Sequence, residues 1–189
     1  MSKSVLISIQ PYWVFLIIAK AMGWNIDKEK TNEVRKGFPK YEGWNEVAKI
    51  YCSKNKKSFA KIPKEYQPLM NPLLGKVIGE FVCDEIQTIH KDDFSAYGIY
   101  DCSDDDVIAS CMQEGLLWDY GQGKDLYFWH ISNLKIYDEP KELSEFKKIT
   151  QPCWYGEMGI SKRDCHECKS KDCFIQRPPQ SWCYVEEKE

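Results

Sequence analysis

The sequence predicts an α+β fold that is mainly β: a small barrel with a few flanking helices. Three observations lead to this prediction. Several short segments have strand character, few segments have helical periodicity, and strands and helices do not alternate in the rhythm of a parallel sheet. The chain has 189 residues, of which 43% are hydrophobic and 14% aromatic, enough to bury one core but not two. We therefore expect a single domain over residues 1–189.

The first three predicted elements are a strand, a helix and a second strand. Ser4–Gln10 is a predicted strand that ends at Pro11. Tyr12–Met22 carries apolar residues at helical spacing, and Gly23 ends this predicted helix. Asn32–Lys36 is the second predicted strand because its β-branched residue and the Gly and Pro that follow disfavour a helix.

The middle of the chain contains a lysine-rich segment between two strands. Val47–Cys52 alternates as a strand does. Ser53–Leu74 holds three prolines and five lysines, which predicts an excursion from the barrel with at most short helices. Gly75–Ile89 is the strongest strand candidate, and its length predicts a bend near Cys83 and Asp84.

The remaining elements are one helix and two strands. Asp104–Asp106 precedes a short apolar run, which predicts a helix start where carboxylates meet free amides, and this explains the acidic run without a metal. Leu126–Tyr137 and Ser181–Glu186 are further predicted strands.

The net charge of −3 hides an uneven distribution. Lys28–Lys64 has 11 basic residues against 4 acidic ones, whereas Asp84–Glu145 has 15 acidic against 4 basic. Binding of nucleic acid would therefore depend on a local basic patch. The first segment offers such a patch together with possible stacking surfaces, which are Tyr41, Trp44, Tyr51, Phe59 and Tyr66. The alternative is a solvated lysine-rich loop.

Nine cysteines without a predicted signal peptide or membrane span favour a cytoplasmic protein with reduced thiols. Cys52, Cys83, Cys102 and Cys111 lie among apolar neighbours and are predicted to pack in the core.

A second group of cysteines is clustered. Cys153, Cys165, Cys168 and Cys173 fall within a 21-residue window, so we expect a cysteine-rich insertion at about 151–177 that holds one structural zinc. His166 and Cys183 are possible substitute ligands, and a loop of free cysteines is the alternative.

Three charged residues lie close together in Lys28–Arg35. In an extended strand Glu33 and Arg35 point to one side and can hold each other, whereas Lys30 points to the other side and reaches round the edge. A helical turn would instead pair Lys30 with Glu33. A solvated edge strand without a function is the simplest alternative.

This run resembles the G-x-K-x-x-E-x-R signature of the ASCH domain family, with Lys30, Glu33 and Arg35 on its charged positions and Lys28 in place of the glycine. Other similar segments follow in the family's order along nearly the whole chain: Val5–Pro11, Gly75–Phe81, Trp129–Leu134 and Pro178–Val185. The chain looks most like ASCH proteins of bacteria and their phages. The resemblance implies a PUA-like barrel whose cleft, lined by Lys30, Glu33 and Arg35, binds RNA or a nucleotide.

Two further residues are candidate ligand contacts. His130 would be an acid, a base or a base-edge contact, and Trp182 would stack a base. For each, burial among aromatic neighbours is the commoner outcome.

Two other functions stay open. Some members of the family hydrolyse modified cytidines with a lysine and a threonine three residues later. Here Lys30 matches the lysine, but Glu33 stands in the position of the threonine. If the chain is a hydrolase or ribonuclease, Lys30 and Glu33 are the candidate catalytic residues. The third possibility is a phage-encoded factor that binds a host protein through the acidic segment 84–145.

Overall fold

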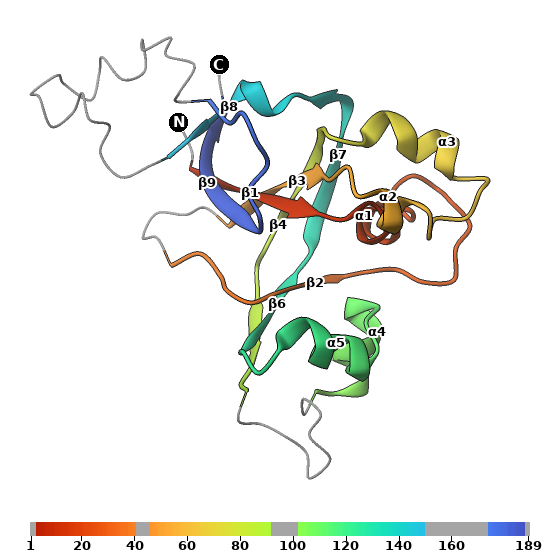
Figure 1. The fold of residues 1–189 in the computed structure, drawn as a ribbon, viewed down its shortest axis with the longest axis vertical. Helices are drawn as coiled ribbons and strands as arrows, with labels where there is room; N and C mark the ends of the chain where they lie inside the picture. Colours follow the sequence, from red (N-terminus) through yellow and green to blue (C-terminus); the bar gives the residue numbers. More distant parts are fainter. Residues whose placement is uncertain (1–2, 41–45, 92–101, 150–173, 188–189) are drawn as a thin grey trace, which may run out of the picture.

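The computed structural model describes residues 3–40, 46–91, 102–149 and 174–187, whose strands form two sheets (Figure 1). The larger sheet has six strands in the order β7 (Ser132–Lys141), β4 (Val77–Val82), β3 (Val47–Cys52), β1 (Ser4–Ile9), β9 (Trp182–Glu187) and β8 (Phe146–Lys148). The smaller sheet has three strands in the order β2 (Asn32–Arg35), β6 (Leu126–His130) and β5 (Ile86–Ile89). Among the strands of the described ranges, only β1 and β3 pair in parallel. The mainly β α+β class is therefore confirmed, whereas closure into a barrel is not seen in the described residues and stays a prediction.

Two segments predicted as single strands pass from one sheet to the other. Gly75–Ile89 divides into β4 and β5 at the predicted bend: the Cys83 amide still bonds the Glu46 carbonyl in register with the β3–β4 pairing, and from Ile86 the chain pairs with β6 instead. The second, Leu126–Tyr137, divides into β6 and β7 at Ile131: its amide still bonds the Thr31 carbonyl in register with the β2–β6 pairing, and from Ser132 the chain pairs with β4 instead. The bend predicted in Gly75–Ile89 is therefore confirmed, whereas the prediction of one strand over Leu126–Tyr137 was wrong, because periodicity continues through a bend at which the partner strand changes.

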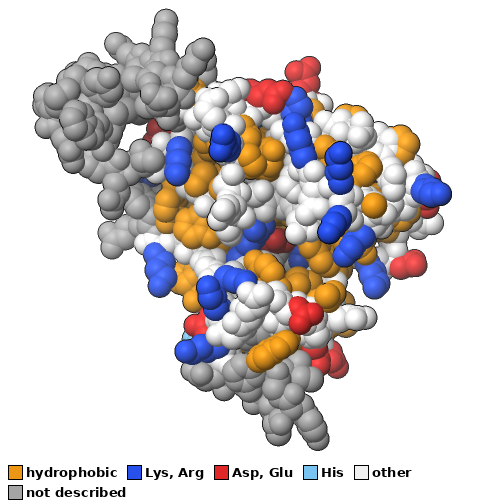
Figure 2. Space-filling model, viewed as in Figure 1, with side chains coloured by type: hydrophobic (Ala, Val, Ile, Leu, Met, Phe, Trp, Pro, Cys, Tyr) orange, Lys and Arg blue, Asp and Glu red, His pale blue; other side chains and the backbone are white. Residues whose placement is uncertain are grey.

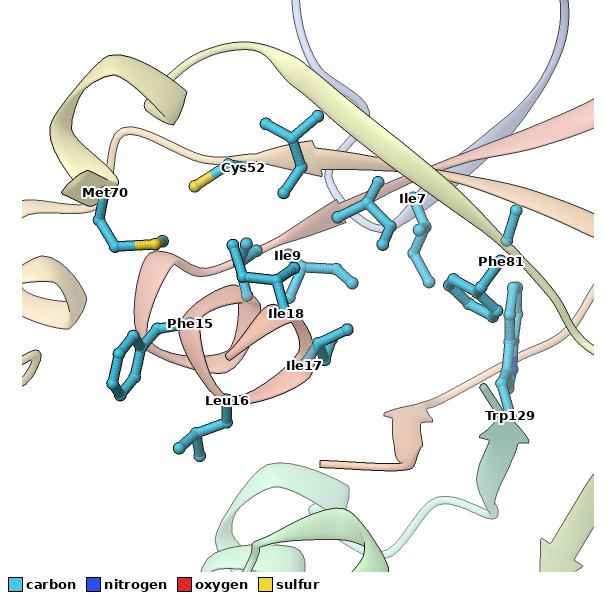
Figure 3. Packing of buried hydrophobic residues seen from close by; sticks show 14 of the residues in the cluster. Ile7, Ile9, Phe15, Leu16, Ile17, Ile18, Cys52, Met70, Phe81 and Trp129 are labelled. Atoms are coloured by element: carbon cyan, nitrogen blue, oxygen red, sulfur yellow. The ribbon is translucent and has the colours of Figure 1, made fainter. Parts of the chain in front are cut away.

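Helix α1 (Pro11–Ile18) packs across the six-stranded sheet and carries the main core. It ends four residues earlier than predicted, although the Met22 amide still bonds the Ile18 carbonyl. Figure 3 shows Ile17 and Ile18 of this helix turned toward Ile7 and Ile9 of β1. The side chain of Trp129, from the smaller sheet, completes this core and joins the two sheets.

The outer face of the smaller sheet is covered by α4 (Asp104–Ser110) and α5 (Glu114–Gly121). Ser103 caps α4, because its hydroxyl accepts from the Asp106 amide and the Asp106 carboxylate bonds back to the Ser103 amide. The predicted acidic helix start is thus confirmed. Helix α5 and strand β8 were not predicted.

The excursion 53–74 contains α2 (Lys56–Phe59), α3 (Gln67–Met70) and the 3-10 helix η1 (Asn71–Leu73), in agreement with the prediction of short helices. A second 3-10 helix, η2 (Leu143–Glu145), precedes β8. None of the helices in the described ranges is both long enough and apolar enough to cross a membrane.

A buried lysine organises the other face of the six-stranded sheet. The Lys49 ammonium donates to Glu80 at 2.9 Å, to Glu187 at 2.8 Å and to the Tyr137 hydroxyl at 3.2 Å. Glu187 also pairs with Lys141. The three donors of Lys49 are therefore satisfied, and the network holds the end of β9 against β3, β4 and β7.

Tyr137→Phe is expected to lower the free energy of unfolding by about 1.5–3 kcal/mol, because the hydroxyl donates to the Glu80 carboxylate at 2.7 Å. Burial raises the pKa of Tyr137 to about 12. A pKa raised on folding means that this contribution is complete below the unfolded value near 10 and is lost between pH 10 and 12. Urea unfolding from pH 8 to 12 should thus show a smaller loss of stability in the variant than in the parent protein. An equal decrease of the free energy of unfolding with pH in both proteins would contradict the prediction.

Candidate functional site

Strand β2 places Glu33 and Arg35 on one face, as the sequence predicts. The Arg35 guanidinium lies 2.9 Å from Glu33 Oε1 and donates to the Ser8 carbonyl of β1 at 2.7 Å. In the pairing with β6, Glu33 lies opposite Trp129 and Arg35 opposite Tyr127, so these aromatic residues share the face. Arg35 therefore ties the smaller sheet to the larger one.

Lys30 joins the same group, contrary to the prediction that it points to the other side. Its ammonium donates to the carbonyls of Asn32 at 2.6 Å and Ser110 at 2.8 Å, and it lies 3.5 Å from Glu33 Oε2. The alternation of a strand does not extend back to Lys30 because β2 begins at Asn32. The Lys30 amide instead bonds the Leu16 carbonyl of α1. We call Lys30, Glu33 and Arg35 the charged triad.

The charged triad is buried, which excludes the solvated edge strand. The side chains of Lys30, Glu33 and Arg35 are 1%, 7% and 8% exposed. Burial lowers the pKa of Lys30, while the Glu33 carboxylate acts in the opposite direction. Each charge is therefore compensated inside the protein rather than by water.

Three buried polar atoms beside one another in sequence lack a hydrogen-bond partner among the described residues: Asn32 Oδ1, Glu33 Oε2 and Arg35 Nε. Glu33 Oε2 has only the ion pair with Lys30. Such atoms normally find a partner, because each one left unpaired costs about 1–3 kcal/mol. Of these, Arg35 Nε and Glu33 Oε2 belong to the triad, whereas Asn32 alternates with Glu33 and Arg35 along β2 and faces the other side of the sheet.

The triad's strand crosses the molecule between two lobes. Figure 1 shows β2 running between α1 and the six-stranded sheet on one side and the pair α4 and α5 on the other. Figure 2 shows a recess at this level of the same face, with basic and acidic side chains inside it and many basic side chains around it. The fold thus leaves an opening where β2 lies.

Tyr120 of α5 is a site residue that the sequence did not indicate. Burial raises its pKa, Arg35 lowers it and Glu33 raises it, so Tyr120 lies within electrostatic range of the triad. The Lys36 ammonium stands 5.0 Å from its ring centroid. The available signal was the helical spacing of Leu117 and Tyr120 after Glu114, which the glycines of this short segment obscured.

His130 is not brought to the triad. It lies opposite Asn32 in the β2–β6 pairing, and residues that alternate with Glu33 and Arg35 face the other side of the sheet. Its Nδ1 is 2.7 Å from Asp84 Oδ1, and this hydrogen bond lowers the pKa of Asp84. His130 is half exposed, so it is neither packed between aromatic rings nor a neighbour of the triad.

Trp182 lies on the same side as the triad but within an aromatic cluster. Its ring centroid is 6.3 Å from that of Trp129 and 5.5 Å from that of Tyr184. It is only partly buried. Trp182 therefore packs against the core and is not fully covered by it.

The four predicted zinc ligands, Cys153, Cys165, Cys168 and Cys173, lie outside the described residues, as does His166, so the zinc site stays a prediction. Cys183 lies in β9, where burial raises its pKa to about 11. Within the described ranges no three His, Cys, Asp or Glu side chains form a group suited to a metal.

The prediction of core packing is confirmed for two of the scattered cysteines. Cys52 and Cys83 are buried, and burial raises the pKa of each thiol to about 12. Cys102 and Cys111 are half-buried at the edges of two core clusters.

Two solved structures are similar to this chain. No family model and no curated protein matches the chain. A serine-to-alanine variant of the ASCH protein from Zymomonas mobilis matches with a TM-score of 0.51 and 16% identity, over 99% of this chain and 91% of that one. The chain has the fold of an ASCH protein. The crystal structure of ASCH from the same organism matches 98% of this chain and 90% of that one, with a TM-score of 0.49 and 16% identity. The resemblance seen in the sequence is therefore confirmed at the level of the ASCH fold.

Proposed function

We propose that this protein binds RNA or a nucleotide in the recess at β2. The observation that carries the proposal is the buried charged triad, in which Arg35 Nε has no hydrogen-bond partner among the described residues and Glu33 Oε2 has only the 3.5 Å ion pair with Lys30. Edges of nucleobases present hydrogen-bond donors and acceptors side by side, and they match a fixed donor next to a fixed acceptor. A bound ligand would satisfy both atoms and recover the free energy lost by leaving them unpaired.

The geometry favours binding over hydrolysis. A lysine acts as a base only when its amine carries a free lone pair directed at the substrate. The Lys30 amine instead donates to two carbonyls and lies beside Glu33, which stabilises the protonated form although burial lowers the pKa. Lys30 therefore positions the Glu33 carboxylate.

The ASCH fold supports the same proposal, because the resemblance implies RNA recognition in the cleft of a closed barrel. We extend the proposal to that barrel: the two sheets would close around the recess, with Arg35 bonded to Ser8 as one link between them. The aromatic residues on the triad's face, Tyr127 and Trp129, would form the wall behind the ligand.

The test is direct binding. Fluorescence anisotropy with a labelled 12-nucleotide single-stranded RNA and competition by mononucleotides should show binding that weakens as salt rises, by about 0.7 log unit per log unit of salt for each phosphate contact. Mass spectrometry of molecules that co-purify with the protein should detect nucleotides or RNA. Absence of binding at 50 mM salt and of any co-purified nucleotide would overturn the proposal.

A further inference from the structure

The lysine-rich excursion 53–74 is a fixed part of the fold rather than a solvated loop. Ile62 and Met70 are 2% and 0% exposed and belong to the main core. Asn55 caps α2 by accepting from the Ser58 amide, and the Gln67 side chain donates to the Ile62 carbonyl at 2.8 Å. The backbone of the excursion is therefore anchored at several points along its length.

Aromatic packing adds a further anchor. The ring of Tyr66 lies 5.3 Å from that of Phe15 and 5.4 Å from that of Trp24, and its hydroxyl donates to the Asn25 carbonyl. Phe15 belongs to α1, so the excursion is held against the helix that flanks the recess. Side chains that project from it occupy defined positions on the surface.

The outward side chains are strongly basic. Five lysines of the excursion are exposed, and among the residues that the structure describes none of them forms an ion pair: Lys54, Lys56, Lys57, Lys61 and Lys64. Glu65 is the one acidic residue of the segment. We call these five residues the lysine platform. Five like charges within residues 54–64 repel each other, so binding of a polyanion would lower their electrostatic free energy.

The lysine platform adjoins the recess through α1. The Ser58 hydroxyl of α2 accepts from the Tyr12 amide at 3.1 Å, and the next residue, Trp13, has its ring centroid 5.2 Å from the Lys30 ammonium. Figure 1 shows α2 beside α1, and Figure 2 shows basic side chains over this part of the face that contains the recess. One ligand can thus contact both the lysine platform and the recess.

We propose that the lysine platform binds the phosphates of a single-stranded RNA, one nucleotide of which occupies the recess. The proposal rests on the proposed function and specifies its substrate class, a strand of several nucleotides rather than a free nucleotide. A single strand is required because only an unstacked nucleotide can enter the recess. The partly exposed rings of Tyr12 and Trp13, between the platform and the triad, are suited to stacking a neighbouring base.

The test compares two variants with equal changes of charge. The platform variant replaces Lys56, Lys57, Lys61 and Lys64 by Gln; the control variant replaces the exposed Lys91, Lys124, Lys135 and Lys148 by Gln. The platform variant should lower the salt slope for a 12-nucleotide RNA by about 2.8, or 0.7 per lysine, and weaken binding at 50 mM salt by roughly 100-fold or more. The control variant should change the slope far less, and both should bind mononucleotides as the parent protein does.

The outcomes separate this inference from the proposed function. An unchanged slope in the platform variant, while the recess variant Arg35→Lys loses affinity, would overturn the platform and leave RNA binding at the recess intact. Equal losses in the platform and control variants would also overturn it, because net charge alone would then explain them. Failure of the parent protein to bind RNA while it binds mononucleotides would overturn the platform and leave nucleotide binding at the recess intact, whereas failure to bind either would overturn both. Heparin bound as tightly as RNA would overturn the substrate class.

Discussion

Glu33→Gln is expected to lower the free energy of unfolding by about 3–5 kcal/mol, because the substitution leaves two buried cations without their shared counter-charge. Glu33 Oε1 lies 2.9 Å from the Arg35 guanidinium, and Oε2 lies 3.5 Å from the Lys30 ammonium. Glutamine has nearly the same shape, so the loss reports charge rather than packing. Urea denaturation followed by tryptophan fluorescence measures it.

Glu29→Gln is the matched control, because the Glu29–Lys20 pair lies at the surface with side chains 40% and 77% exposed. Exposed pairs contribute about 0–1 kcal/mol, so this variant should stay close to the parent protein. The double variant Lys30→Met with Glu33→Gln should recover part of the loss, because it removes one of the two uncompensated cations. Equal stability of the Glu29 and Glu33 variants would contradict the proposed role of the triad.

Arg35→Lys is expected to weaken RNA binding by about 10- to 100-fold, the equivalent of roughly 1.4–2.8 kcal/mol. The guanidinium bonds Ser8 and Glu33 through one terminal nitrogen, and its Nε has no hydrogen-bond partner among the described residues. The lysine introduced at position 35 can replace the bonds to Ser8 and Glu33, but it has no second donor held at a fixed angle that could bond the RNA. The buried positive charge is kept, so stability should fall much less than in Glu33→Gln.

Arg177→Lys is the matched control, since Arg177 is exposed and lies outside the recess. Fluorescence anisotropy with the 12-nucleotide RNA should show unchanged affinity for this variant. If Arg35→Lys keeps the affinity of the parent protein at all salt concentrations, the ligand does not contact Arg35 and the recess is not the binding site.

Much of the site was predictable because strand geometry is local. A period of two residues places Glu33 and Arg35 together in any extended chain, and their pairing is observed. Lys30 could not be placed in this way, because its position depends on where β2 begins and on the Ser110 carbonyl 80 residues away. The positions of Tyr120 near the triad and of His130 away from it depend likewise on contacts between distant segments.

The sequence by itself determined the mainly β class, the positions of most strands, the short helices of the excursion and the resemblance to the ASCH fold. These properties follow from residue preferences and periodicities that act over a few neighbours. Only the tertiary structure decided that long strands divide between two sheets, that the charged triad is buried and that the lysines of the excursion stand on a fixed surface. Burial is the physical reason, because whether a charge meets water or a counter-charge depends on which distant segments cover it.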